Sequence, residues 1–73
     1  MMHYPSLISA IKARREMLQV TQAQLAALSG VSSRTVKAFE SGKGNPTLET
    51  LIKLADALGL EVNFKVKQMR IDS

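Results

Sequence analysis

The chain has 73 residues, of which 45% are apolar, with ten lysines and arginines against six aspartates and glutamates. This length allows one domain near the lower limit for a self-sufficient core, and the absence of cysteine excludes disulfides and thiolate metal sites. The sequence shows no signal peptide and no apolar run of membrane-spanning length, so we expect a cytoplasmic protein without membrane contact. All the excess positive charge lies in residues 1–45, which suits a surface for a phosphate backbone.

The residue types do not predict an enzyme. His3 is the only histidine, and no pair of carboxylates shares a cleft-forming element. Gly42 and Lys43 lack the earlier glycine and the following serine or threonine of a phosphate-binding P-loop. We therefore expect no catalytic residue, no metal site and no cofactor.

The first predicted helix opens at Pro5 and Ser6, after an N-terminal arm of residues 1–5, because proline suits a first turn and serine suits a cap. Arg15 interrupts its apolar stripe, and an unpaired buried charge is costly. Glu40 is the best partner in the chain, and the alternative is that Arg15 extends its charged end into solvent. The apolar positions of the stripe are Leu7, Ile8, Ile11 and Leu18.

A short second helix is predicted for residues 22–29. Thr21 can cap it, and Gln24 stands at the spacing that completes a capping box. Gly30 follows, a residue that tolerates the left-handed backbone of a helix end. Ala26 is small, as a close crossing with the next helix requires.

A third helix, residues 33–41, follows a tight turn. Ser32 is its predicted N-cap and Gly42 its end. Val36 and Phe39 are its apolar positions, expected in the core. Its outward face is a short donor surface without large apolar groups, which suits a major groove. That face consists of Ser33, Arg34, Lys37 and Ala38.

Residues 42–46 form a predicted loop, in which Lys43 and the backbone amides can contact phosphates and set the register of the preceding helix. Thr47 caps a fourth helix, residues 48–58, and Gly59 ends it. This helix carries no functional signal, so we expect it to support the core.

Residues 60–67 change to a period of two and predict one strand in an otherwise helical chain. No other segment of the sequence has the pattern of a strand that could pair with it. We therefore expect it to pair with the same strand of a second copy across a two-fold axis. The alternative is pairing with residues 2–4 of the same chain. Residues 68–73 would form a flexible tail. The apolar face for dimerisation is Leu60, Val62, Phe64 and Val66.

The chain resembles the helix-turn-helix of phage repressors and of XRE-type regulators over roughly residues 7–60. The resemblance implies an all-α fold of four to five helices, a compact bundle like that of lambda repressor, over residues 6–59. It also implies that Arg15 and Glu40 pair across the fold. The positions that carry the resemblance are Gln22, Ala26, Gly30, Val36 and Phe39.

We expect double-stranded DNA as the partner, with a homodimer reading a near-palindromic operator. Arginine matches the paired acceptors of guanine best, so Arg34 is expected to read bases together with Ser33 and Lys37. A second group is expected to hold phosphates. It consists of Arg15, Gln22, Ser32, Thr35, Lys43 and Asn45.

Four helices followed by a Leu-Glu-Val strand also resemble the HipB-like antitoxins. This resemblance implies an autoregulatory repressor that also binds a HipA-like toxin kinase. Two alternatives stand beside it: a stand-alone regulator without a toxin, and a protein-interaction module for which DNA is secondary.

Overall fold

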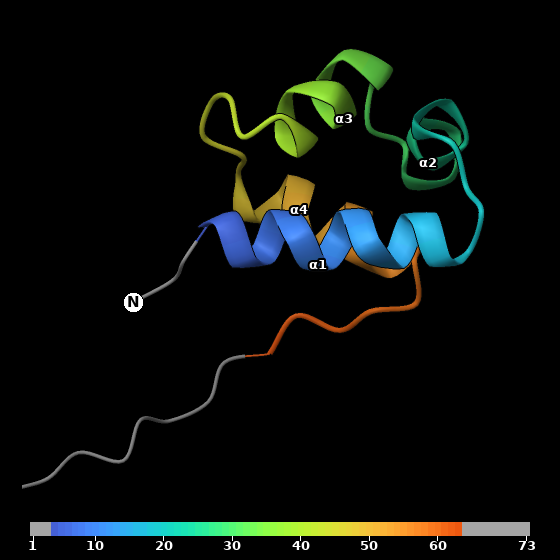
Figure 1. The fold of residues 1–73 in the computed structure, drawn as a ribbon. Coiled ribbons are helices and arrows are strands. Elements are labelled where there is room, and N and C mark those ends of the chain that lie inside the picture. The colour runs from blue at the N-terminus through green and yellow to red at the C-terminus, as the bar shows by residue number, and fades with distance from the viewer. Residues whose placement is uncertain (1–3, 64–73) are drawn as a thin grey trace, which may run out of the picture.

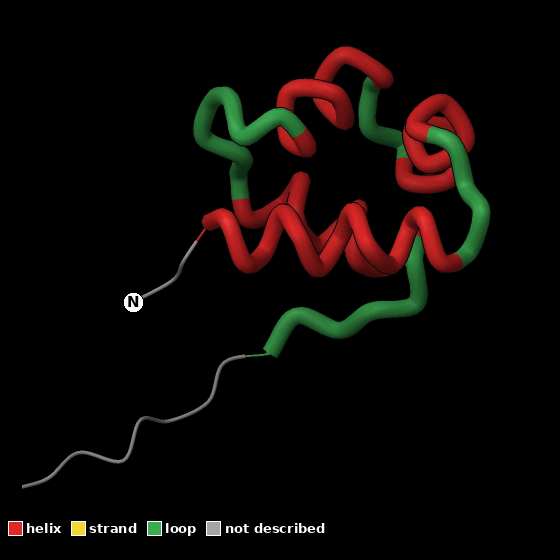
Figure 2. The backbone as a smooth tube through the Cα atoms, in the orientation of Figure 1, coloured by secondary structure: helices red, strands yellow, loops and turns green. Residues whose placement is uncertain are grey.

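The computed structural model describes residues 4–63 and folds them into four helices. The helix α1 runs across the base with α4 behind it, and α2 and α3 lie above (Figure 1). The described residues contain no strand (Figure 2), so the expected all-α bundle is confirmed with four helices. Their bounds are α1 Tyr4–Met17, α2 Gln22–Ser29, α3 Ser33–Glu40 and α4 Leu48–Ala57.

The predicted N-caps of α2, α3 and α4 are confirmed. Thr21 Oγ1 accepts the Gln24 N–H at 3.0 Å, and Gln24 Oε1 accepts the Thr21 N–H at 2.8 Å, which completes the capping box. Ser32 and Thr47 accept backbone N–H groups in the same way at the starts of α3 and α4. These bonds satisfy donors that a helix start otherwise leaves without partners.

All four helices are followed by a left-handed residue that helps to close the last turn. Gly30, Gly42 and Gly59 take φ values of 75°, 77° and 72° after α2, α3 and α4, and Gly30 is the predicted end of α2. The helix α1 ends in the same manner without a glycine, because Gln19 takes a φ of 57° and the Val20 N–H donates to the Arg15 carbonyl at 3.1 Å. No glycine marks this end in the sequence.

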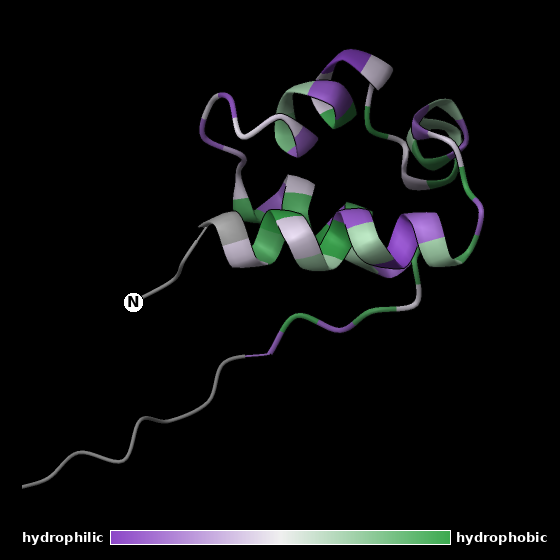
Figure 3. Cartoon of the chain, in the orientation of Figure 1, coloured by the Kyte–Doolittle hydropathy of each residue, from purple (hydrophilic) through white to green (hydrophobic). Residues whose placement is uncertain are grey.

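One core joins all four helices, and apolar residues line the inner sides of the helices (Figure 3). The helix α2 packs against α3 and α4, and α1 packs against α3. Ala26 is buried where the helices meet, as its small size predicts. The buried residues are Ile11, Leu25, Ala26, Val36, Phe39, Leu51, Leu54, Ala55 and Leu58.

Two predictions for α1 are wrong. The helix begins at Tyr4, so Ser6 lies inside it and is not its cap. Leu18 is 43% exposed rather than buried, because α1 ends at Met17 and the left-handed turn at Gln19 directs the chain away from the apolar stripe.

After α4 the chain turns back beneath α1, on the side away from α3 (Figure 1). Arg14 Nε donates to the Leu58 carbonyl at 3.0 Å at this turn. Leu60 and Val62 then pack against the core while Glu61 and Asn63 are exposed, so this stretch alternates as predicted.

Part of the predicted dimerisation strand lies outside the described residues, namely Phe64 to Lys67, as do residues 1–3 of the arm and the tail 68–73. Residues 60–63 form a loop in the single chain, so pairing between copies stays a prediction. Tyr4 belongs to α1, which removes it from the alternative strand pairing with residues 2–4.

Candidate nucleic-acid interface

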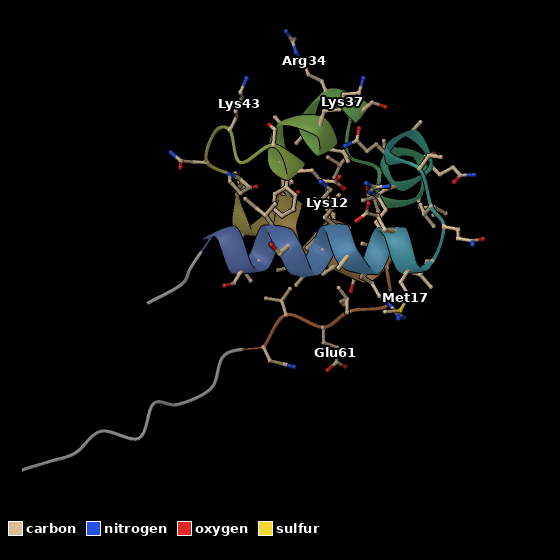
Figure 4. All side chains as sticks on the ribbon, in the orientation of Figure 1. Lys12, Met17, Arg34, Lys37, Lys43 and Glu61 are labelled. Atoms are coloured by element: carbon tan, nitrogen blue, oxygen red, sulfur yellow. The ribbon has the colours of Figure 1, made fainter. Side chains whose placement is uncertain are left out.

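The outward face of α3 presents polar side chains that the fold does not use. Ser33, Arg34 and Lys37 are exposed, whereas Val36 and Phe39 are turned into the core at 0% and 3% exposure. Arg34 and Lys37 point away from the other three helices (Figure 4). A helix with one face fixed by packing can therefore offer the opposite face to a ligand.

The N-cap of α3 lies at the edge of this face. The Ser32 hydroxyl accepts the Thr35 N–H at 3.1 Å and donates to Thr35 Oγ1 at 2.8 Å. Both side chains are exposed, and Thr35 keeps acceptor and donor capacity toward solvent. Ser32 and Thr35 thus cap the helix and also keep polar atoms accessible to a ligand.

The loop after α3 brings Lys43 to the same side of the molecule as Arg34 and Lys37 (Figure 4). The Gly42 N–H donates to the Phe39 carbonyl and the Lys43 N–H to the Ala38 carbonyl, at 3.1 and 3.0 Å. These bonds attach the loop backbone to the end of α3, so the position of Lys43 is coupled to that of the helix.

A shallow hollow lies between α3 and this loop. Arg34 and Thr35 line one wall, and Lys43, Asn45 and Pro46 line the other. Asn45 is exposed and can donate or accept hydrogen bonds. The hollow therefore places two cations and a polar amide around one concave surface.

The far end of α3 holds a partly buried ion pair. Arg15 Nε and Nη2 donate to the two carboxylate oxygens of Glu40 at 2.7 and 2.9 Å. The side chains are only 12% and 3% exposed. A third bond, from Arg15 Nη1 to the Val20 carbonyl at 2.8 Å, also fixes the end of α1. Arg15 therefore lies in the fold with a partner, and does not extend freely into solvent.

Gln22 joins the same network. Its Nε2 donates to Glu40 Oε1 at 3.0 Å, so the first residue of α2 is tied to the last residue of α3. Together, Arg15, Gln22 and Glu40 connect α1, α2 and α3. The bidentate, charge-assisted pair of Arg15 and Glu40 holds its two partners in a defined geometry.

The network shifts the pKa values of its charged members. Burial alone would raise the pKa of Glu40, but hydrogen bonds from Arg15 and Gln22, with the charges of Arg15 and Lys12, bring it below its ordinary value. The hydrogen bond to Glu40 raises the pKa of Arg15. Both groups are therefore held in their charged forms.

Lys12 is a contributor that the sequence reasoning missed. It is exposed on α1, one turn before Arg15, and its charge helps to lower the pKa of Glu40. The three-residue spacing from Arg15 was the available signal, because such residues lie on one helix face.

Two classes of site are absent from the described part of the chain. Residues 4–63 contain no group of three His, Cys, Asp or Glu side chains that could hold a metal ion. None of the four helices is both long and apolar enough to span a bilayer.

Comparison with known proteins adds independent information. Residues 11–64 match the model of the helix-turn-helix family. The chain is 44% identical over 50 residues to the cryptic phage CTXphi transcriptional repressor RstR of Vibrio cholerae, covering 68% of this chain and 45% of that protein. It is 43% identical over 54 residues to an uncharacterised HTH-type transcriptional regulator of Haemophilus influenzae, covering 74% of this chain and 55% of that protein. The chain thus spans about half the length of these relatives.

Proposed function

The chain belongs to the helix-turn-helix family, and from this membership we propose that it is a sequence-specific DNA-binding transcriptional repressor. The names of the two relatives support a role in transcription, and that of the Vibrio cholerae protein supports repression. The proposal includes binding to the promoter of its own gene.

One observation carries this proposal: the outward face of α3 is basic, and the only acid of the helix is paired with Arg15. Arg34, Lys37 and Lys43 are exposed on one side of the molecule (Figure 4) and form no ion pair with any described residue. Glu40, the only acid of α3 and its flanking turns, is neutralised by Arg15. A phosphate backbone would therefore meet positive charge without a compensating carboxylate.

We assign base reading to Arg34, Ser33 and Lys37. A major groove is wide enough to admit a helix, and the first residues of a recognition helix approach the base edges. Arg34 stands second in α3 with its guanidinium in solvent, and its paired donors fit the N7 and O6 acceptors of guanine.

We assign phosphate contacts to two structural groups. Ser32, Thr35, Lys43 and Asn45 lie around the start of α3 and the following loop, where side-chain donors and backbone amides can meet one strand. Arg15 and Gln22 form the second group, at the ends of α1 and α2. Gln22 has a second amide hydrogen beyond the one given to Glu40, so it can bond a phosphate without leaving the network.

The proposed active form is a homodimer on a near-palindromic operator. Two-fold symmetry places two recognition helices in successive major grooves, about 34 Å apart. Pairing of Leu60, Val62, Phe64 and Val66 between copies is part of this proposal. Its support in the described residues is the alternation of buried and exposed side chains from Leu60 to Asn63.

A second candidate is a protein-interaction role, including that of an antitoxin for a HipA-like toxin kinase. The observation that favours it is exposed apolar surface on helices other than α3: Met17 of α1 is 71% exposed and Leu28 of α2 is 65% exposed. A kinase gene transcribed with this one, and a stoichiometric complex of the two purified proteins, would support that role.

The test of the repressor function is binding of the purified chain to its own upstream region over a series of salt concentrations. A scrambled duplex of equal length and composition is the control. We expect tight binding to the native duplex, weak binding to the control, and an affinity that falls steeply with salt. Equal, weak binding to both duplexes would show that the basic surface is only a non-specific contact, and would overturn the repressor proposal.

A further inference from the structure

One flank of α4 exposes two large aliphatic side chains that the core does not use. Leu48 is 50% exposed and Ile52 is 41% exposed. They are four residues apart and so lie on the same side of the helix. The core contacts of α4 come from other positions, namely Leu51, Leu54 and Ala55.

A charged pair accompanies these two residues along the same helix. Glu49 and Lys53 are also four residues apart, and Glu49 Oε1 lies 3.2 Å from Lys53 Nζ. Their side chains are 78% and 47% exposed, so both can change partners easily. Along one turn, α4 therefore presents an acid and a base next to Leu48 and Ile52.

This arrangement is complementary to itself after a two-fold rotation. If two α4 helices pack antiparallel, Leu48 faces the partner's Ile52 and Ile52 faces the partner's Leu48. The same rotation brings Glu49 within reach of the partner's Lys53. A two-fold contact must use the same patch on both copies, and this patch supplies both the apolar pair and the opposite charges.

We propose that this flank of α4, formed by Leu48, Glu49, Ile52 and Lys53, is a contact between two copies of the chain. A domain of this size has a small core, so burial of two further aliphatic residues per copy would stabilise it.

The location of this flank is compatible with DNA binding. Leu48 begins α4 directly after the loop that carries Lys43, and the loop lies above the start of α4 (Figure 1). An axis beside α4 would set the two Lys43 loops near the centre of an operator and leave Arg34 and Lys37 open. This inference rests on the proposed DNA-binding function for its biological meaning, but the association of two copies can be measured without DNA.

The other exposed apolar patch gives no such indication of an occupant. Leu18, Val20, Ala27 and Leu28 line a hollow between α2 and the turn that precedes it. The helix α2 carries no charged residue, so nothing there specifies what would bind. Leu28 consequently serves as the matched control.

The test is sedimentation equilibrium of the full chain without DNA, comparing the wild type with Ile52→Glu and with Leu28→Glu. Both positions are exposed, and circular dichroism checks that each variant is folded. A dimer contains the changed residue twice, so we expect Ile52→Glu to raise the dimer dissociation constant by about tenfold or more. Leu28→Glu should leave it within about threefold of the wild type.

A charge exchange gives a second test. Lys53→Glu places two acids opposite each other in the dimer and should weaken association, whereas Glu49→Lys combined with Lys53→Glu should restore it. A monomeric wild type, or an unchanged dissociation constant for Ile52→Glu, would overturn the proposed contact. Failure of DNA binding with an intact α4 dimer would instead contradict the proposed function alone.

Discussion

The two ends of α3 carry charged side chains in opposite physical states. At the start, Arg34 lies in solvent without a described ion-pair partner. At the end, Glu40 is 3% exposed and accepts bonds from Arg15 and Gln22. The helix thus separates charges that position it from charges that remain available to a ligand. Changes at the two ends should have different consequences, for stability in one case and for DNA binding in the other.

Replacing Glu40 by alanine should have the largest effect. The change leaves the guanidinium of Arg15 largely buried without its carboxylate, and such a loss costs about 3 kcal/mol. The free energy of unfolding, measured by urea denaturation, should fall by that amount, with exposed Glu61→Ala as the control. A loss below about 0.5 kcal/mol would place the pair among weak surface contacts and remove the contrast between the two ends.

Replacing Arg34 by alanine should alter DNA binding without altering stability. We expect a loss of about 1 to 3 kcal/mol in the preference for the native operator over a duplex mutated at the contacted base pair. Fluorescence anisotropy with both duplexes measures this preference, and urea denaturation checks the fold. If Arg34→Ala weakened both duplexes equally, the guanidinium would be a phosphate contact rather than a base reader.

Replacing Lys43 by alanine should weaken binding to all sequences alike. The loss of one phosphate contact should reduce the slope of log affinity against log salt by about one. The same anisotropy titrations, repeated over several salt concentrations, measure that slope. A changed sequence preference with an unchanged slope would instead assign Lys43 to the bases.

Mild acid should weaken the buried end of α3 by a smaller amount than the alanine replacement. The pKa of Glu40 is lower in the folded chain than its ordinary value. The network therefore adds its full stability at pH values above the ordinary pKa of a glutamate. The contribution is lost as the pH falls through the folded pKa. Thermal unfolding from about pH 6 to about pH 3 should show this loss, and Glu40→Gln should flatten it. If the stability of the wild type and of Glu40→Gln fell equally with pH, groups other than Glu40 would cause the loss.

The helix-turn-helix was predictable because its determinants are local. The capping box of Thr21 and Gln24, the cap at Ser32 and the glycines after the helices act within a few residues, and the structure contains each of them. The Arg15 contact with Glu40 spans 25 residues, yet a charge on an apolar stripe requires a partner and few acids were available.

The features that escaped prediction depend on details that the local pattern does not contain. Gln19 adopts a left-handed backbone that glycine usually marks, so the end of α1 and the exposure of Leu18 were missed. Nor did the sequence show that Gln22 bonds Glu40, because that contact depends on the crossing of α2 and α3. Lys12 lowers the pKa of Glu40 through the attraction between its positive charge and the carboxylate, and not through a hydrogen bond.

The most direct test of the division within α3 is an amide-resolved NMR titration of the folded chain with its operator duplex. We predict that the largest chemical-shift changes occur at residues 32–38 and 42–45. Met17 and Glu61 lie away from the face that carries Arg34 (Figure 4) and should change little. The largest changes at those two residues, with small changes at Arg34 and Lys43, would contradict the assignment of this face to DNA.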